Sequence, residues 1–576
     1  MNTEKKLTGY PSIDKPWLKY YREEPDRTII TEQTIYQLVF SNDQDMNSVA
    51  LEYLKVKWTF EKLKKETDKA AASFYSSGLR CGDVVLIGVS SCPEAIVCLL
   101  ALNKIGVVSK WFDIRAGEKD IKEYANESKC KYLIAFDMLL PLIKCVIDQT
   151  NLEKVLIITP ADSLSIVKQI GYSIKEKNSI PKDERFVLYR DFITNNYSQI
   201  DVECVPFNIN RPSIMIQSSG TTGKPKVIVH SDYSVANMAK SLSYSDMPIG
   251  KSKKLLNLLP PWIAYSIVTA VIYPLALGCE VILSPVFDPD TLMKYIGDFT
   301  ISFTAPPPYR YLYEHFDDLS SSRKKAFYDS IDGLASGGDK ISIDENKRIE
   351  EKLHTILFNG YGNNEACSVL TVNPIKHNKY GSVGIPKYGD TIIAFDNENQ
   401  KELKYNEIGE ICALTDTMLL YYEGNEKATA SIKKLHPDGQ IWLHTGDLGY
   451  IDEEGFVFLK GRIRRVIARN GFKLSAYTIE EAICEHPMVK ECVVVEVNDI
   501  EEEHVPMAFI VLNEDVEESE AIIRESVIKK CKQDLKENEI PKYINIVNAL
   551  PYTQNGKYDF RKLEELGNKY VDSIKQ

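Results

Sequence analysis

The sequence predicts an α/β protein with a large amino-terminal region of helix-flanked sheets, a barrel-like β portion, and a small α+β domain at the carboxyl end. Three observations predict this fold class. Helical and strand patterns alternate over about the first 400 residues, short strands with Gly and Asp turns follow, and a compact mixed pattern closes the chain. Alternation of this kind favours parallel sheets covered by helices on both faces.

The first region carries the clearest alternation. TFEKLKKETDKAAASFYSSG has apolar residues at helical spacing, VVLIGVS is a short apolar run, and PEAIVCLLALNKIG is helical again. KYLIAF, KVLIIT, VILS and ISFTA continue the series as short buried strands. The whole chain has 576 residues, and single cores stop growing at about 250–300 residues, so several packed lobes are expected.

One stretch, residues 255–279, carries no charged side chain and is long enough to cross a bilayer. Prolines at 260, 261 and 274 interrupt it, and CEVILSP at its end is typical of a buried strand. We therefore expect a buried helix and strand here, with no stable membrane insertion. The amino terminus also lacks the apolar run of a signal peptide.

The charge balance excludes a global attraction to nucleic acid or to an anionic membrane. Seventy Lys and Arg stand against 82 Asp and Glu, which gives a net charge of −12, so any anion must be bound locally. The 12 cysteines form no CxxC pair and there are only 8 histidines, so the spacing indicates neither a zinc framework nor a dense disulfide scaffold. A reducing, cytoplasmic setting fits this cysteine usage best.

The pattern changes after about residue 400. GEICAL, GQIWLHTGDLGYID and GFVFLKGR are typical of short strands separated by turns, which predicts an antiparallel or barrel-like portion at about 400–461. Beyond a basic segment, GRIRRVIARNGFKL, the helical patterns YTIEEAICEH and SEAIIRESVIKKCKQDL flank the strand patterns ECVVVEV and MAFIVLN. We place a domain boundary between Gly461 and Arg465, so that residues 462–576 form a separate domain.

The most informative segment is IMIQSSGTTGKPKVIVHS, in which an apolar strand ends in a loop of hydroxyl groups, glycines and lysines. Glycines let the backbone approach a phosphate, while hydroxyls, free N–H groups and lysines supply donors and positive charge. Two residues separate the glycines and a proline follows the first lysine, which distinguishes the loop from the common P-loop. The expected polyphosphate contacts are Ser218, Ser219, Gly220, Thr221, Thr222, Gly223 and Lys226.

SSGTTGKPK resembles the signature of the adenylate-forming superfamily, which includes acyl- and aryl-CoA synthetases, adenylation domains of nonribosomal peptide synthetases and luciferases. Four later segments resemble the other motifs of this superfamily in the same order: FNGYGNNEA, HTGDLGYIDEEGFVFLKGR, NGFKLSAYTIEE and LPYTQNGKYDF. The resemblance implies a large AMP-binding adenylation domain with two helix-flanked sheets, residues 1–461. It also implies a mobile carboxy-terminal domain that turns about a hinge at about 462–465.

The resemblance implies roles for single residues at the nucleotide. Glu365 corresponds to the magnesium-binding acid, with Thr221 as a second metal ligand, and Tyr361 to the adenine contact. Asp447, helped by Arg462, would hold the ribose hydroxyls. The superfamily usually has Thr in place of Asn364, whose amide can still donate a hydrogen bond to the α-phosphate. The other expected nucleotide contacts are Gly337, Gly338, Asn359 and Gly362.

The carboxy-terminal domain is expected to serve both half-reactions. Lys557 corresponds to the lysine that bridges the carboxylate and the α-phosphate and neutralises the charge that grows in the transition state. Arg464 stands at a hinge position that is commonly Asp, which reverses the hinge electrostatics. After rotation, Gly471 and Lys473 would line the tunnel for a pantetheine arm.

The carboxylate pocket is expected around PPWIAYSI, with Trp262, Tyr265 and Ser336 as substrate contacts. Amino-acid-activating domains normally place an Asp here to hold the substrate ammonium group, and this stretch has none. A carboxylic acid without an α-amine, aliphatic or aromatic, is therefore favoured. Packing of Trp262 and Tyr265 in the core is the open alternative.

The sequence thus predicts an enzyme, an ATP-dependent acid–thiol ligase of the AMP-forming acyl-CoA synthetase type. With ATP, Mg²⁺ and CoA it would form an acyl-adenylate and pyrophosphate, and then an acyl-CoA and AMP. The alternative is a free-standing adenylation enzyme that loads the phosphopantetheine of an acyl carrier protein. A non-catalytic nucleotide sensor and a luciferase-like oxygenase are further classes, and the presence of Lys226 and Lys557 disfavours the sensor.

Overall fold

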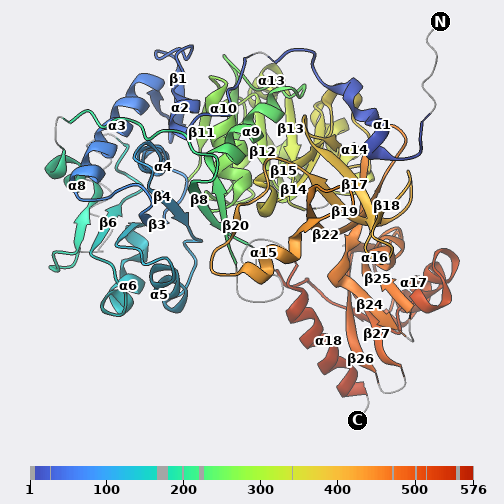
Figure 1. Cartoon of the computed structure of the whole chain (residues 1–576). Coiled ribbons are helices and arrows are strands. Elements are labelled where there is room, and N and C mark those ends of the chain that lie inside the picture. Colours follow the sequence, from blue (N-terminus) through green and yellow to red (C-terminus); the bar gives the residue numbers. More distant parts are fainter. Residues whose placement is uncertain are drawn as a thin grey trace, which may run out of the picture.

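The computed structural model describes residues 7–25, 27–164, 180–197, 200–218, 226–339, 341–469, 472–499, 502–513, 516–552 and 558–574. These residues form two large sheets, a third, antiparallel sheet and a carboxy-terminal part with two smaller sheets (Figure 1). The predicted α/β fold, with a large two-sheet region and a small α+β part at the carboxyl end, is confirmed.

The first large sheet has eight strands in the order β20-β9-β8-β4-β3-β5-β6-β7. The strands from β8 to β7 pair in parallel, whereas β9 and β20 pair antiparallel at one edge. The predicted strands VVLIGVS, KYLIAF and KVLIIT form β3, β5 and β6. The bounds are β3 Val84–Gly88, β4 Val108–Trp111, β5 Tyr132–Phe136, β6 Lys154–Ile158, β7 Phe186–Leu188, β8 Pro212–Gln217, β9 Val227–Ser231 and β20 Tyr421–Tyr422.

Helices cover both faces of this sheet, as the alternation predicted. On one face lie α3 (Phe60–Ser76), α4 (Pro93–Lys104) and α8 (Tyr189–Asn196), and on the other α5 (Glu118–Glu127) and α6 (Leu140–Val146) (Figure 1). Thr59 begins α3 by accepting a hydrogen bond from the N–H of Lys62 at 3.1 Å. The proline that opens α4 stands where a helix needs no N–H donor.

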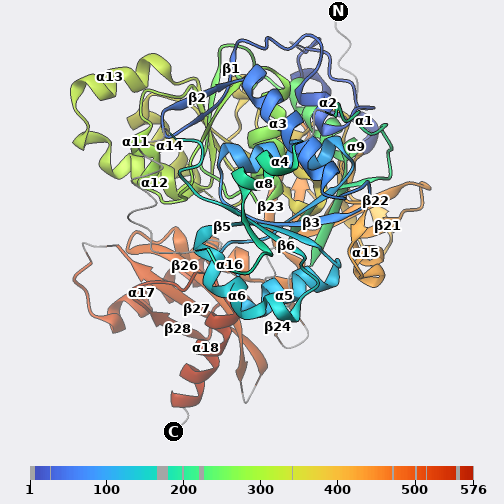
Figure 2. The same ribbon diagram turned by 90° about the vertical axis from the view of Figure 1, so that its left-hand side faces the viewer.

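The second large sheet has nine strands in the order β16-β15-β14-β13-β12-β10-β11-β1-β2, parallel from β14 to β1. One face carries α11 (Thr291–Lys294), α12 (Pro306–His315), α13 (Ser321–Ser330) and α14 (Ile343–Leu353), which gather together in Figure 2. The strand bounds are β1 Val49–Tyr53, β2 Val56–Thr59, β10 Lys254–Asn257, β11 Glu280–Leu283, β12 Ile301–Thr304, β13 Gly333–Ser336, β14 Leu357–Asn363, β15 Ser368–Val372 and β16 Ile385–Pro386.

The other face of the second sheet is covered by α2 (Ile35–Val39), α9 (Asp232–Ser243) and the uncharged segment 255–279. This segment begins in β10, continues as a π-helix, Tyr265–Ile272, and α10, Tyr273–Ala276, and leads into β11. The expected buried helix and strand are confirmed, and Leu255–Asn257 add a second strand. Among the described residues, no helix has the length and apolar character needed to cross a membrane.

The third sheet has the strand order β18-β17-β19-β22-β21, with β23 also paired to β22, and every pairing is antiparallel. The predicted strands GEICAL, GQIWLHTGDLGYID and GFVFLKGR are confirmed as β19, β22 and β23, and β22 runs unbroken from Ile441 to Ile451. A bulge between β19 and β22 accommodates the glycine, Gly446, without ending the strand. The other bounds are β17 Thr391–Asp396, β18 Lys401–Glu402, β19 Gly409–Leu414, β21 Lys433–Leu435 and β23 Val457–Arg462.

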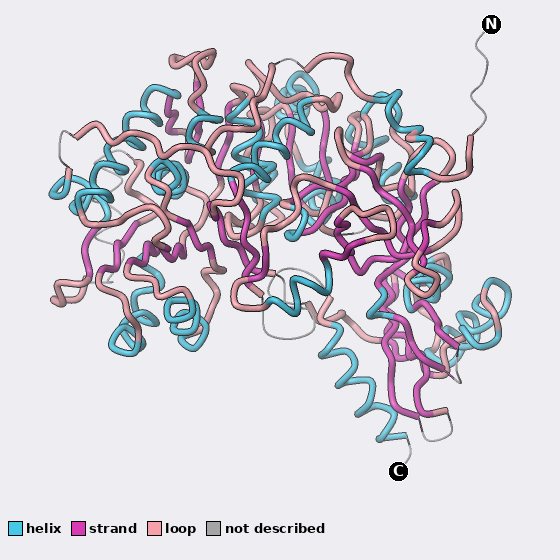
Figure 3. The backbone as a smooth tube through the Cα atoms, in the orientation of Figure 1, coloured by secondary structure: helices cyan, strands magenta, loops and turns pink. Residues whose placement is uncertain are grey.

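The carboxy-terminal part contains the predicted helices and strands, drawn in orange to red at the lower right of Figure 1 and in strand and helix colours in Figure 3. Arg465 ties its start to the rest of this part, because its guanidinium pairs with Glu480 at 2.5 Å and lies 4.1 Å from the ring centroid of Phe560. The bounds are β24 Val466–Arg469, β25 Phe472–Ser475, α16 Ala476–Cys484, β26 Val489–Asp499, β27 Glu503–Leu512, α17 Glu520–Asp534, β28 Tyr543–Ile546 and α18 Phe560–Ile574.

Candidate active site

The predicted phosphate loop connects the antiparallel strands β8 and β9. Ser218 and Lys226 close it, because the N–H of Ser218 donates to the carbonyl of Lys226 at 2.8 Å and the N–H of Lys226 donates to the Ser218 hydroxyl at 2.9 Å. Both ends of the loop are therefore held side by side at the end of a hairpin. The five remaining predicted phosphate contacts lie outside the described residues: Ser219, Gly220, Thr221, Thr222 and Gly223.

Glu365 lies in the 3₁₀ turn Asn364–Ala366 directly after β14. The hydroxyl of Tyr422 donates to its Oε1 at 2.8 Å, and the ammonium group of Lys226 lies 4.9 Å from the centroid of the Tyr422 ring. Within the described part of the chain, Tyr422 is the one hydrogen-bond donor to this carboxylate, so Oε2 is left for another ligand. A carboxylate oxygen held in this way suits a hard cation such as Mg²⁺.

Asn364 joins three segments. Its Nδ2 donates to the carbonyl of Gln217 at 2.9 Å, and its Oδ1 accepts from the N–H of Ala264 at 3.2 Å. His230 donates from Nε2 to the carbonyl of Asn364 at 2.7 Å, and burial lowers the pKa of His230 to about 4, so the ring is neutral at pH 7. The side chain thus links the end of β8 to residues 260–267, the segment predicted to form the acid pocket and called the acid-pocket segment below, and one amide hydrogen remains for the predicted α-phosphate contact.

Asp447, Tyr361 and Arg462 form a second group. The Tyr361 hydroxyl donates to Oδ2 of Asp447 at 2.5 Å, and Nε of Arg462 lies 2.9 Å from Oδ1. Asp447 and Arg462 are register partners on β22 and β23, which explains their pairing. Burial, and after it the Asp447 charge, raises the pKa of Tyr361 well above its usual value, and Asp447 raises the pKa of Arg462. A neutral phenol and a guanidinium therefore both hold the Asp447 side chain.

Two glycines of the site, Gly362 and Gly337, are positions of close approach. A Cβ at Gly362 would lie 1.7 Å from the carbonyl oxygen of Ser368, where β14 and β15 bulge, so no side chain fits there. A Cβ at Gly337 would lie 3.2 Å from the Tyr265 ring, whereas Gly338 has φ +84° and open space around it. Asn359 lies opposite Ser336 in the β13–β14 register. The sheet thus brings these predicted nucleotide contacts beside the acid-pocket segment.

Trp262 and Tyr265 belong to the acid-pocket segment. Trp262 is 8% exposed, its Nε1 has no hydrogen-bond partner among the described residues, and the Arg115 guanidinium lies 5.9 Å from its ring centroid. Tyr265 is half-buried, and its ring centroid lies 6.2 Å from that of Phe303. Ser336, 2% exposed at the end of β13, also has a hydroxyl without a partner in the described residues. Buried polar groups normally have a hydrogen-bond partner, so these two donors are candidates for bonds to a ligand.

Lys557, Gly471 and the side chains of Arg464 and Lys473 lie outside the described residues. The residues that flank the Lys557 segment, Tyr552 and Tyr558, are joined by a β-bridge, and both hydroxyls donate to Oε2 of Glu491, at 2.9 and 3.3 Å.

Asp339, the residue after Gly338, lies close to this anchored pair. Burial is the largest cause of the raised pKa of Tyr558, followed by Glu491, Tyr552 and then Asp339. Tyr558, the first described residue after position 557, therefore lies near Asp339.

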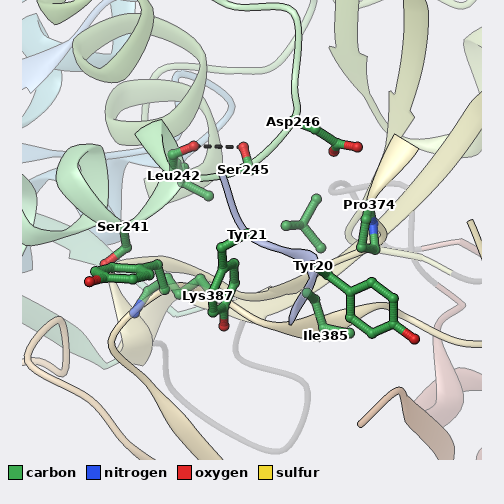
Figure 4. Close-up of a pocket in the computed structure, with 11 residues that line it drawn as sticks. Tyr20, Tyr21, Ser241, Leu242, Ser245, Asp246, Pro374, Ile385 and Lys387 are labelled. Carbon is green, nitrogen blue, oxygen red and sulfur yellow. Dashed lines mark hydrogen bonds between the residues drawn. The ribbon is translucent and has the colours of Figure 1, made fainter. Parts of the chain in front are cut away.

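A crevice outside this group lies between the amino-terminal segment, α9 and β16 (Figure 4). Its lining includes Tyr20, Tyr21, Leu242 and Ile385, and the ammonium group of Lys387, which bonds to Asp390. None of the predicted site residues that the structure describes lines it. Its aromatic side chains pack the amino-terminal segment onto the second sheet.

Two family models match the chain. The model described as "AMP-binding enzyme" covers residues 40–422, and the model "AMP-binding enzyme C-terminal domain" covers residues 478–557. The chain belongs to the AMP-binding enzymes. The first model extends through Tyr422 and includes Lys226, Tyr361 and Glu365, and the second ends at Lys557.

Relatives of this AMP-binding enzyme match it over nearly their whole length. A long-chain-fatty-acid–CoA ligase of Bacillus subtilis is 26% identical over 579 residues, covering 97% of this chain and 99% of that protein. A crotonobetaine/carnitine–CoA ligase of Salmonella arizonae is 25% identical over 510 residues, covering 87% and 92%.

Solved structures share the fold. The anthranilate CoA ligase AuaEII in complex with anthranoyl-AMP aligns with a TM-score of 0.79 at 20% identity, covering 94% of this chain and 99% of that one. ATP-bound MatB from Rhodopseudomonas palustris aligns with a TM-score of 0.80 at 21% identity, covering 93% and 99%.

Three residues of this AMP-binding enzyme that contact the site are absent from the sequence predictions. Tyr422 bonds to Glu365, His230 supports the carbonyl of Asn364, and the carbonyl of Gln217 accepts from its side chain. Tyr422 belongs to a two-residue strand, and His230 reads as one residue of an apolar run. Their spacing carries no signal for these contacts.

Proposed function

We propose that this AMP-binding enzyme activates a carboxylic acid without an α-amine by using ATP, and then transfers the acyl group to CoA. The observation that carries the proposal is the convergence of three groups on one segment, Tyr361–Glu365. Tyr361 holds Asp447, Asn364 holds the start of the phosphate loop, and Glu365 meets Tyr422 next to Lys226. Groups suited to ribose, phosphate and cation therefore lie along five consecutive residues.

The ribose end of the nucleotide is assigned to Asp447. A carboxylate that accepts from Tyr361 on one oxygen and from Arg462 on the other keeps a free lone pair on each. Both ribose hydroxyls can donate to it, because the two donors hold its plane in one orientation. The neutral phenol of Tyr361 adds no charge at pH 7, so its ring can lie against a purine.

The phosphate end is assigned to the loop closed by Ser218 and Lys226 and to Glu365. Lys226 brings positive charge to the loop end, and Tyr422 orients Glu365 through Oε1 so that Oε2 points to a separate ligand position. Mg²⁺ bound by Glu365, with Thr221 as the second predicted ligand, would neutralise phosphate oxygens and ease the departure of pyrophosphate.

In the first step, the carboxylate oxygen of the acid attacks the α-phosphorus in line, and pyrophosphate leaves. Lys557 is proposed to bridge the carboxylate and the α-phosphate, and the anchoring of its neighbours Tyr552 and Tyr558 near Asp339 supports this placement. In the second step, the CoA thiolate attacks the acyl carbon and AMP leaves. Arg464, Gly471 and Lys473 are proposed to serve the domain rotation and the pantetheine arm.

The acid itself is proposed to bind against Trp262, Tyr265 and Ser336. Residues 260–267 offer aromatic surface and no carboxylate for an ammonium group, and Trp262 Nε1 and the Ser336 hydroxyl on β13 have no partner among the described residues. The relatives named as CoA ligases of fatty acids, crotonobetaine and carnitine support CoA as the acceptor.

ATP–pyrophosphate exchange with a panel of carboxylic acids tests the first step. Comparing thioester formation with CoA and with a holo-carrier protein tests the acceptor. Lys557→Ala is expected to slow adenylate formation by about 10²–10³-fold, whereas Lys562→Ala, an exposed lysine on α18, is the matched control and should behave as wild type. Adenylate formation by Lys557→Ala at the wild-type rate would falsify the mechanism. Turnover with the carrier protein and none with CoA contradicts the proposed acceptor.

A further inference from the structure

Cys412, His436 and His444 form a buried cluster in the third sheet, outside the proposed active site. Cys412 on β19 and His444 on β22 are register partners, so their side chains share one face of the sheet. His436 follows β21 in a turn that its N–H closes by donating to the carbonyl of Gln440 at 2.9 Å. One sulfur and two ring-nitrogen atoms of the three side chains all lie within 4.8 Å of one another.

Neighbouring side chains hold the two imidazole rings in place. Nδ1 of His444 lies 2.7 Å from Oε2 of Glu410 and donates to it, which leaves Nε2 as the acceptor, 2.9 Å from Nε2 of His436. The ring of His436 is stacked between Phe395 and Trp442, with centroid distances of 4.0 and 5.2 Å. A histidine that donates one ring N–H to a carboxylate and presents the other nitrogen is the usual arrangement around a bound metal.

We propose that Cys412, His436 and His444 together bind one Zn²⁺ ion. A thiolate with two imidazoles matches the borderline-soft character of zinc and disfavours Mg²⁺ and Ca²⁺, which take oxygen ligands. Nitrogen ligands about 2.0–2.1 Å from a tetrahedral zinc lie roughly 3.4 Å apart, so the two Nε2 atoms need to separate by only about 0.5 Å. The cluster supplies three ligands, and a water molecule would complete the tetrahedron.

Such an ion would act on the sheet and not on the reaction, because the cluster is buried and lies outside the proposed active site. It would cross-link β19, β22 and the turn after β21 at a point three residues before Asp447 in the chain. Glu410, which supports His444, also accepts from the N–H of Gly446 through Oε1 at 2.9 Å. Metal binding would therefore stiffen the bulged part of β22 from which Asp447 projects. The proposal stands on these contacts and is independent of which acid or thiol the enzyme uses.

The test uses the full-length protein, reconstituted with Zn²⁺ and passed through gel filtration. We expect one equivalent of zinc in the wild type and less than about a tenth of that in Cys412→Ser and in His436→Gln. Cys492→Ser is the matched control, because Cys492 is also a buried strand cysteine but lies in β26, and it should retain the full equivalent.

Substitution with Co²⁺ keeps the test decisive even where a variant fails to fold. Wild-type protein should show a thiolate-to-cobalt charge-transfer band in the near ultraviolet and tetrahedral d–d bands in the visible. The proposal is overturned if the wild type retains no zinc and shows no such band. In that case Glu410, His444 and His436 form only a chain of hydrogen bonds. Equal zinc in wild type and Cys412→Ser also overturns it, since the ion would then be bound elsewhere.

Discussion

Replacing Asp447 with Asn keeps the shape of the side chain and removes its charge. In the wild type the carboxylate accepts from Tyr361 at 2.5 Å and pairs with Arg462 at 2.9 Å. Arg462 is half exposed, so loss of this ion pair changes the free energy of unfolding by no more than about 1 kcal/mol. The larger effect is expected on ATP, whose ribose hydroxyls are proposed to donate to the same two oxygens.

The size of that effect follows from the change in acceptor. A hydrogen bond to a charged group contributes about 1.5–3 kcal/mol, and a neutral one about 0.5–1.5 kcal/mol. The hydrogen bonds of the two ribose hydroxyls are therefore weakened by about 2–3 kcal/mol in total, which corresponds to a roughly 30- to 150-fold fall in kcat/KM for ATP. The kcat/KM for the carboxylic acid, measured at saturating ATP, should change far less.

The assay is pyrophosphate release under varied ATP. Asp452→Asn is the matched control, because Asp452 follows the same strand and pairs with Lys379 at 2.6 Å instead of with a proposed ligand group. The control should leave kcat/KM for ATP within about twofold of wild type. If Asp447→Asn also falls within that range while folding normally, the assignment of the ribose to Asp447 is refuted.

Three further predictions concern folding. Asn364→Ala should lower the free energy of unfolding by about 2–4 kcal/mol in urea, because two backbone groups lose their partner, and unchanged stability would contradict this. Gly362→Ala should yield no soluble folded protein, because its Cβ would clash with the Ser368 carbonyl. Gly338→Ala, which has open space around it, should lower the free energy of unfolding by only about 1–2 kcal/mol. A soluble Gly362→Ala protein with a melting temperature within about 2 °C of wild type would refute the prediction. Burial raises the pKa of Glu94 to about 7 from 4.5, so the folded state keeps this proton while the unfolded state loses it. The free energy of unfolding of the wild type, relative to that of Glu94→Gln, should therefore fall by about 3 kcal/mol as the pH rises from 4.5 to 7. If the two proteins lose stability in parallel over this pH range, Glu94 is not the group responsible.

Local periodicity was enough to predict several elements of the large sheets. The apolar runs that form β3, β5 and β6, and the helical spacing of α3, carry their own signals, because a buried strand or an amphipathic helix is defined within a few turns of chain. The strand β22 was also predicted as one segment, but its bulge was not. The bulge depends on the neighbouring strand β19, where Glu410 accepts from the N–H of Gly446.

In the candidate site too, some residues were predictable from local sequence and others were not. Motifs of the chain identify Glu365, Tyr361 and Asp447, because each stands at a characteristic distance from glycines and polar residues in its own segment. The partners of these residues come from far along the chain. Tyr422 is 57 residues from Glu365, and His230 is 134 residues from Asn364, so no local pattern relates them.

The sequence by itself determined the family, the alternation of helices and strands, and the residues proposed to bind the nucleotide, since each of these depends on short contiguous segments. Tertiary structure alone decided which of those residues meet, because hydrogen bonds and ligand clusters depend on distances that strand pairing sets. The cluster of Cys412, His436 and His444 makes the difference plain: its spacing fits no metal motif, and antiparallel pairing of β19 with β22 is what brings the sulfur beside the two rings.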